Sequence, residues 1–224
     1  MKKSFLFSFG LIAAFALLFV SCDNGDDDYT PTTSQYKAVD LGLSVKWATF
    51  NVGATKPEEY GGYYAWGETW EKKGCSWETY KWCDGTSISM TKYCTDSSEG
   101  TVDNKKVLDF EDDVAHVKWG GSWRMPTKAE QDELCNNCSW EWTALNGVNG
   151  YRVTGPNGNR IFLPAAGYRR GTDVYDKGEE GYYWSSSLSG SYSDSAYGLG
   201  FDVEEFFWDS SDRFYGWSVR PVLE

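Results

Sequence analysis

The order of apolar and polar residues in the first half of the chain predicts short strands followed by a long irregular segment. Residues 36–54 alternate well enough to form one or two strands, with Gly42 and Gly53 as breaks. Residues 56–68, "KPEEYGGYYAWGE", predict a short helical turn that runs into an aromatic strand. Residues 70–105 contain three cysteines and many Gly, Ser and Asp, so we expect a long loop region that is functional or tied by disulfides.

Two helices are predicted in the middle of the chain. Residues 111–119, "EDDVAHVKW", have the pattern of a short helix. Farther on, Thr127 and Glu130 have the spacing of a capping box, in which each side chain satisfies a free backbone N–H of the first turn. The second helix should therefore begin at about Lys128.

The second half of the chain predicts strands. Asn157 and Gly158 supply the positive φ that a tight turn requires, so residues 151–163 should form a β-hairpin. Residues 182–222 have no helical period and should form three further strands joined by Ser, Gly and Asp loops. Helices in the first half and strands in the second indicate an α+β domain.

The N-terminus has the pattern of an export signal. Two lysines precede an apolar run, residues 5–20, which is short for a membrane span, and Ser21 and Cys22 follow it. Residues 1–21 resemble a bacterial lipoprotein signal peptide, which implies that Cys22 is lipidated; a plain secretory signal with a structural cysteine is the alternative. Residues 22–35 are acidic and rich in Thr and Pro, as is typical of a flexible tether. The tether also resembles the surface-export signal of some lipoproteins, so we expect an outer-membrane lipoprotein exposed at the cell surface.

Charge excludes one class of partner. The chain has a net charge of −12, and removal of residues 1–21 would leave 19 basic and 33 acidic residues, a net charge of −14. A surface this acidic repels phosphate backbones and anionic lipid headgroups. We therefore expect no nucleic-acid partner, and we expect membrane contact only through the lipid on Cys22. Residues 36–224 are enough for one well-packed domain.

Cysteine and histidine do not indicate an enzyme or a metal site. Five cysteines follow Cys22, an odd number, so at least one thiol should be free and the pairing stays open. The pair in "CNNC", Cys135 and Cys138, follows a helical pattern and so lies near a helix C-terminus, where the dipole disfavours a thiolate. His116 is the only histidine and should be structural or solvated. We therefore expect no catalytic residue, no cofactor and no bound transition metal, while a structural calcium stays open.

The C-terminal part of the chain is unusually aromatic. Between Tyr182 and Trp217, 12 of 36 residues are aromatic, against 17% of the whole chain. Strand alternation predicts that Tyr197, Leu199 and Phe201 face the core, while Gly198, Gly200 and Asp202 face outwards. Rings among Ser, Gly and Asp are the composition of antibody-like binding surfaces. We therefore expect a ligand-binding face formed by Tyr192, Asp194, Gly198, Gly200, Asp202, Phe207, Trp208, Asp209, Ser211, Asp212, Phe214, Tyr215 and Trp217.

Four blocks carry a resemblance to a known family: residues 120–134, "GGSWRMPTKAEQDEL"; 150–169, "GYRVTGPNGNRIFLPAAGYR"; 181–188, "GYYWSSSL"; and 216–222, "GWSVRPV". With them the chain resembles the major paralogous (FISUMP) domain of bacterial lipoproteins, in the C-type-lectin-like superfamily. The resemblance implies paired N- and C-terminal strands, two helices and a long-loop region that presents a binding surface. Formylglycine-generating enzymes share that fold, but their late cysteine pair has no counterpart after Cys138, and the calcium-lectin triplets are absent too.

The resemblance also implies possible diversification by a retroelement that mutates adenines. Such mutation yields Ser, Gly, Asp, Tyr and Phe at target positions and never Glu or Trp. Eight C-terminal residues belong to the allowed set, whereas Glu204, Glu205, Trp208 and Trp217 do not; the eight are Gly198, Gly200, Asp202, Asp209, Ser211, Asp212, Phe214 and Tyr215. An ordinary aromatic surface is the alternative.

Three functions follow as hypotheses. The first is a surface-anchored adhesion module that binds a protein or glycan through its C-terminal face. The second is a structural or tip subunit of a lipoprotein-derived fibre, with the rings buried against a neighbouring subunit. The third is a carbohydrate hydrolase, which the sequence supports least.

Overall fold

A computed structural model describes residues 36–224, apart from the side chains of Trp208 and Asp209. The expected signal peptide, Cys22 and the tether lie outside the described residues. Within the described range, no helix has the length and apolar character needed to cross a bilayer.

The two ends of the domain meet in one sheet. Its strands are β1 (Ala38–Val39), β2 (Lys46–Ala48), β12 (Val222–Leu223) and β3 (Trp123–Arg124), in that order. Val222 lies opposite Trp47 on one side and Arg124 on the other, both in antiparallel register. The pairing of N- and C-terminal strands that the resemblance implies is therefore present.

Both expected helices are present, so the prediction of an α+β domain is confirmed. Helix α1 (Val114–Trp119) follows a 3₁₀ turn, η2 (Phe110–Asp112), and helix α2 (Lys128–Asn137) begins where the capping box placed it. The Glu130 N–H donates to Thr127 Oγ1 at 3.3 Å, and the Thr127 N–H donates to Glu130 Oε2 at 2.8 Å. The Arg124 guanidinium also holds Glu130, at 2.6 Å and 2.8 Å.

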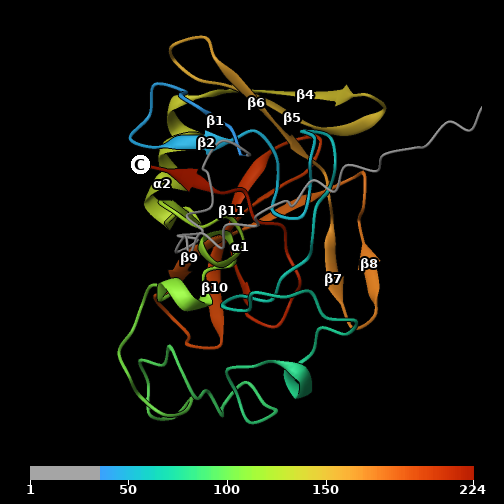
Figure 1. Cartoon of the computed structure of the whole chain (residues 1–224). Coiled ribbons are helices and arrows are strands. Elements are labelled where there is room, and N and C mark those ends of the chain that lie inside the picture. Colours follow the sequence, from blue (N-terminus) through green and yellow to red (C-terminus); the bar gives the residue numbers. More distant parts are fainter. Residues whose placement is uncertain (1–35) are drawn as a thin grey trace, which may run out of the picture. The chain divides into compact units, whose positions relative to one another are not determined.

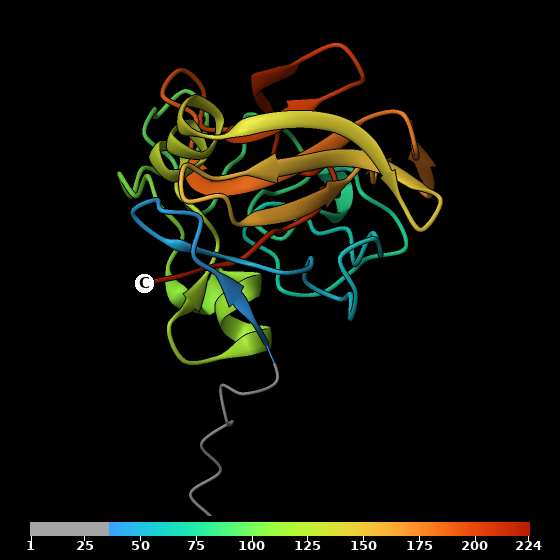
Figure 2. The ribbon, with the colours of Figure 1, turned by 90° about the horizontal axis from the view of Figure 1, so that it is seen from above.

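A three-stranded meander follows α2. Strands β4 (Ser139–Leu145), β5 (Val148–Thr154) and β6 (Arg160–Pro164) pair antiparallel in that order. The predicted hairpin is β5–β6, and Gly158 adopts φ +84° in its turn. The three strands run side by side across the top of the domain in Figure 1 and face the viewer in Figure 2.

The C-terminal region contains the remaining strands. A small hairpin, β7 (Tyr168–Arg170) and β8 (Asp173–Tyr175), precedes a sheet of β9 (Gly181–Leu188), β10 (Ser195–Phe201) and β11 (Phe206–Asp212) (Figure 1). In that sheet β10 lies between β9 and β11, and every pair is antiparallel. The prediction of three strands in this part of the chain is confirmed, with the short β12 in addition.

The aromatic strand expected in residues 56–68 is wrong. That segment is irregular and pairs with the C-terminal segment at isolated positions: the Tyr64 N–H donates to the Trp217 carbonyl at 2.9 Å, and the Trp66 N–H to the Arg213 carbonyl at 2.9 Å. Its rings are buried because it crosses the core, as Tyr64 and Trp66 are 3% and 0% exposed. The apolar content of this segment reflects its burial, and no continuous strand ladder forms there.

The long segment 70–105 is irregular, as expected, with one short 3₁₀ helix, η1 (Trp77–Thr79). Arg213 ties it to the end of β11, because its guanidinium donates to the carbonyls of Lys92 at 3.1 Å and Tyr93 at 3.2 Å. No disulfide forms in this segment, because its three cysteines, Cys75, Cys83 and Cys94, are free thiols, and so are Cys135 and Cys138 of the α2 region. Hydrogen bonds to a buried arginine, and not disulfides, fix this loop.

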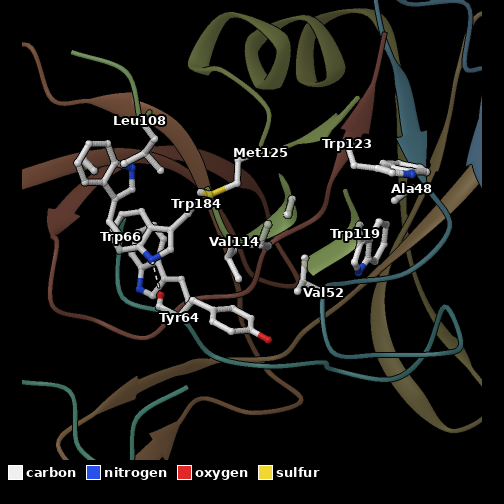
Figure 3. Close-up of a cluster of buried hydrophobic side chains, with 14 of the residues drawn as sticks. Ala48, Val52, Tyr64, Trp66, Leu108, Val114, Trp119, Trp123, Met125 and Trp184 are labelled. Carbon is white, nitrogen blue, oxygen red and sulfur yellow. Dashed lines mark hydrogen bonds between the residues drawn. The ribbon is translucent and has the colours of Figure 1, made fainter. Parts of the chain in front are cut away.

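The core is built largely from indole rings. Trp184 stacks on Trp217 at 3.9 Å with an interplanar angle of 19°, and its Nε1–H donates to the Tyr64 carbonyl at 2.9 Å (Figure 3). Trp119 and Trp123 meet edge to face in the same cluster. A second cluster lies under the meander and contains Leu134, Tyr151, Leu163 and Phe201. The C-terminal sheet therefore rests on a rigid, close-packed base.

Candidate functional site

The glycines of β10 are not open surface, which corrects one expectation. A Cβ at Gly198 would lie 2.5 Å from Cζ3 of Trp217, and a Cβ at Gly200 would lie 2.2 Å from Cε2 of Phe207. Both rings therefore lie directly on the glycine backbone. Positions 198 and 200 are glycine because Trp217 and Phe207 occupy the space that a side chain at these positions would take.

The other face of β10 follows the prediction in part. Leu199 and Phe201 are 1% and 0% exposed, so they belong to the core as expected. Tyr197 is only half-buried, and its hydroxyl accepts a hydrogen bond from the Gly190 N–H at 3.1 Å. Tyr197 is therefore a partly exposed ring on the core face of this strand.

Two of the expected binding rings are buried. Phe214 is 7% exposed and packs edge to face against Trp77 at 4.9 Å, and Trp217 is 2% exposed. Neither can offer a free ring face, because each fills the core between the C-terminal segment and an earlier part of the chain. The side chains of Trp208 and Asp209 lie outside the described part.

The remaining expected residues do not form one site. Tyr192 is 62% exposed and, like Asp194, precedes β10, whereas Asp202 directly follows that strand. A seven-residue strand is roughly 20 Å long, so these groups lie at opposite ends. Asp202 caps its own turn, where its carboxylate accepts from the N–H groups of Glu204 and Glu205 at 2.7 Å and 3.0 Å.

A cavity of about 370 Å³ brings some of the expected residues together with others. Ser211 comes from β11, and Tyr215 and Trp217 from the segment after it. Four further residues complete the lining: Tyr168 of β7, Asp176, Glu180 and Tyr182 of β9. We call this the tyrosine cavity; Asp212 adjoins its Ser211 along the strand.

Rings form the walls of the tyrosine cavity and meet nearly at right angles. Tyr168 is edge to face with Tyr182 at 5.4 Å and 82°, and with Tyr215 at 5.6 Å and 86°. Tyr182 in turn lies 5.0 Å from Trp217. Each ring is supported by another, so the walls are fixed before any ligand arrives.

The turn that carries the two carboxylates is fixed by backbone hydrogen bonds. Asp176 adopts φ +53°, and its carbonyl accepts from the N–H groups of Glu179 and Glu180 at 3.0 Å and 2.9 Å. The Gly167 N–H donates to the Glu180 carbonyl at 2.7 Å. The Tyr182 hydroxyl donates to Glu180 Oε2, which orients that carboxylate. The turn at residues 176–180 and the carboxylate of Glu180 are thus held in place.

Burial and nearby charges raise the pKa of two tyrosines and one carboxyl group in and beside the tyrosine cavity. Burial raises the pKa of Tyr168, and the carboxylate of Asp176 adds to that rise. Burial likewise raises the pKa of Tyr215, although the Arg170 guanidinium, 6.0 Å from its ring centroid, opposes the rise. Burial, and then the charge of Asp194, raises the pKa of Asp212. The hydroxyls remain protonated at neutral pH and can donate hydrogen bonds.

Sequence reasoning missed four of the seven lining residues. Tyr168, Asp176, Glu180 and Tyr182 lie in residues 167–182, "GYRRGTDVYDKGEEGY", which combines tyrosines with acids around a turn. That composition is the same signal that pointed to the C-terminal stretch. The composition of residues 167–182 could therefore have indicated these four residues, but aromatic residues are most frequent farther along the chain.

Burial disfavours the thiolate form of the cysteine pair. Burial raises the pKa of both thiols at the end of α2, that of Cys138 to about 11. His116 lies in α1, where its Nδ1 is 3.3 Å from the Trp123 carbonyl and its ring packs on Phe110 at 4.6 Å. These contacts fit the structural role expected for it.

One acidic group elsewhere has the geometry of a cation site. Oxygens of Asp109, Glu111 and Asp112 lie within 4.8 Å of one another. The Lys92 ammonium already lies 2.7 Å from Asp109 and 2.6 Å from Asp112. A lysine therefore supplies the positive charge there.

Comparison with known proteins adds no relative. No family model, curated protein or solved structure matches this chain. The functional argument therefore rests on the tyrosine cavity itself.

Proposed function

We propose that this chain is a non-catalytic binding module, tethered through a lipid on Cys22 to the outer membrane and exposed at the cell surface. The tyrosine cavity is the observation that carries the proposal. At about 370 Å³ it falls in the size range of ligand pockets, and rings with a few polar groups are their usual lining. The ligand would be a group carried by a protein or a glycan on another cell.

Rigidity of the scaffold supports a binding role. Trp217 rests on Gly198, stacks on Trp184 and exchanges two backbone hydrogen bonds with Tyr64, at 2.9 Å and 3.0 Å. A preformed site loses little conformational entropy when it binds. Many copies on one cell would add avidity even if each site were weak.

We also propose a C-type-lectin-like fold. Two helices, mostly antiparallel strands and the antiparallel pairing of β2 with β12 support it. The long segment 70–105 would be the long-loop region of that fold. Determination of the fold by crystallography, followed by superposition on a C-type lectin, tests this proposal.

Cell attachment tests the binding function. Cells that display the full chain should lose attachment to host or bacterial surfaces when Tyr168 and Tyr215 are both replaced by leucine, provided that the variant is folded. The matched control is Phe110→Leu, since Phe110 is a 62% exposed ring outside the tyrosine cavity. Unchanged attachment of a folded double variant would refute the proposal.

Diversification by a retroelement is proposed only for the open positions. Gly198 and Gly200 are covered by rings, and Phe214 is buried, so substitution there would disturb packing. Ser211 and Tyr215 line the tyrosine cavity and are suited to variation. The test is a search of the neighbouring DNA for a reverse-transcriptase gene and a near-copy of the 3′ coding segment that differs mainly at adenines.

A fibre subunit is the second candidate. Strand β11 is at the edge of its sheet, where it pairs with β10 alone. An edge strand can accept a strand from a neighbouring subunit. This candidate predicts that the purified chain assembles into oligomers, whereas a receptor module should be monomeric in sedimentation.

A further inference from the structure

The ring geometry of the tyrosine cavity distinguishes between classes of ligand. A sugar ring stacks on one flat aromatic face. Here Tyr168 stands at 82° to Tyr182 and at 86° to Tyr215, so the rings form a corner. Perpendicular rings surround a compact group, and their negative faces attract a cation, as in aromatic sites for alkylammonium groups.

Charge around the tyrosine cavity favours the same ligand. Its lining includes Asp176 and Glu180, and neither a lysine nor an arginine of the described residues lines it. Lys177 points elsewhere, because its ammonium lies 4.7 Å from the ring centroid of Tyr60. Arg170 is the basic side chain found beside Tyr215, and it lines a different cavity with Asp173 and Tyr175.

A second cavity of about 410 Å³ adjoins the first and shares Glu180 with it. Trp142 of β4 provides its ring, and Glu179, Asp202 and Glu204 add three further carboxylates. No lysine or arginine of the described residues lines this second cavity either. We call it the acidic cavity.

The carboxylates of the two cavities have no ion-pair partner among the described residues. Asp109 and Asp112, by contrast, are both paired with Lys92. Ion pairs between described side chains involve none of the five cavity carboxylates, which are Asp176, Glu179, Glu180, Asp202 and Glu204. The positive charge that would complement them is not supplied by the chain itself.

We propose that the tyrosine cavity binds an alkylammonium group, the side chain of a lysine in a basic segment of a protein partner, and that the acidic cavity binds a second basic residue of the same segment. This inference rests on the proposed binding function and names its ligand. The rings attract the first ammonium, and Asp176 and Glu180 neutralise it. The shared Glu180 lets one extended segment pass from one cavity to the other.

The test is a titration of the full chain with a fluorescein-labelled peptide that contains two lysines among glycines. Replacement of both carboxylates, Asp176→Asn with Glu180→Gln, should weaken binding roughly three- to thirty-fold. Asparagine tolerates the positive φ of residue 176, and glutamine can still accept from Tyr182. Asp84→Asn is the matched control, because it removes one exposed carboxylate outside both cavities and should leave binding unchanged.

The rings and the ligand charge are tested separately. Tyr215→Leu should weaken binding by a similar factor, whereas Tyr215→Phe, which keeps the ring, should bind like the original chain. Acetylation of both peptide lysines should abolish binding, and added salt should weaken it. Equal binding of the acetylated peptide, or no effect of the double carboxylate change, would overturn the inference.

Two further outcomes separate this inference from the proposed function. If a glycan panel binds through the tyrosine cavity while the lysine peptide does not, the binding function stands and the cationic ligand is wrong. If neither probe binds, both are overturned. If tetramethylammonium alone binds as tightly as the peptide, a small cation is the ligand and the role of the acidic cavity is refuted.

Discussion

Substitution of Gly198 by alanine tests directly whether a ring lies on the β10 backbone. The new Cβ would be 2.5 Å from Cζ3 of Trp217 and 2.7 Å from the Tyr183 carbonyl oxygen. Ordinary contact begins at 3.4 Å, so the indole would have to retreat by about 0.9 Å. Trp184, stacked on the same indole at 3.9 Å, and Tyr182, at 5.0 Å, restrict that movement.

Overpacking of this kind costs about 1–3 kcal/mol of unfolding free energy. For a domain of this size, each kcal/mol lowers the melting temperature by about 2–4 °C, so the expected decrease is about 2–12 °C. Since Trp217 also lines the tyrosine cavity, ligand binding should weaken as well.

The assay is thermal unfolding followed by circular dichroism, with Gly74→Ala as the control. A Cβ at Gly74 would have its nearest neighbour at 3.9 Å, and the backbone there does not adopt a positive φ. Alanine at 74 should therefore be neutral or stabilise by up to about 1 kcal/mol. Equal melting temperatures for the two variants would refute the packing of Trp217 on β10.

Three further predictions concern groups outside the tyrosine cavity. Arg213→Met should lower the unfolding free energy, measured by urea titration, by about 3 kcal/mol or more, because the fully buried guanidinium donates hydrogen bonds to several carbonyls. A decrease below about 1 kcal/mol would contradict this. The rate of Cys138 alkylation, measured by peptide mass spectrometry, should increase about tenfold per pH unit from pH 8 to 10, since burial raises the pKa of Cys138 to about 11. A rate that reaches a plateau below pH 9 would contradict this. Hydrogen bonds from Lys105 and Lys92 lower the pKa of Asp109, so the ionised Asp109 should stabilise the folded state above about pH 4 and lose this effect on further acidification. In a plot of unfolding free energy against pH, Asp109→Asn should therefore reduce the decrease below about pH 4. An unchanged decrease would exclude Asp109 as its source.

Local sequence signals predicted the elements that depend on local physics. The capping box at Thr127 and the turn at Gly158 each fix a few neighbouring residues, and both lie where the pattern placed them. The strand predicted around Tyr64 failed because apolar content shows burial without showing whether a ladder forms. Tyr64 and Trp66 are buried by pairing with residues about 150 positions away, which no local window contains.

The site was predicted in part for a related reason. Aromatic composition located Ser211, Tyr215 and the buried Trp217, but it also selected Phe214, which lies in the core and outside the tyrosine cavity. Composition gives the number of rings and not the side of the sheet on which each lies. The contribution of Tyr168 and Glu180 depends on how the β7–β8 hairpin packs beside the segment that follows β11, and that is set by tertiary contacts such as the hydrogen bond from the Arg169 N–H to the Gly216 carbonyl at 2.7 Å.

Attachment of cells that display the Tyr168→Leu, Tyr215→Leu double variant measures the central claim most directly, because this variant removes two walls of the tyrosine cavity and leaves the buried Arg213 in place. We predict that a double variant whose thermal unfolding remains cooperative loses attachment, while Phe110→Leu cells attach like the original ones. Equal attachment of all three would contradict a binding role for the tyrosine cavity.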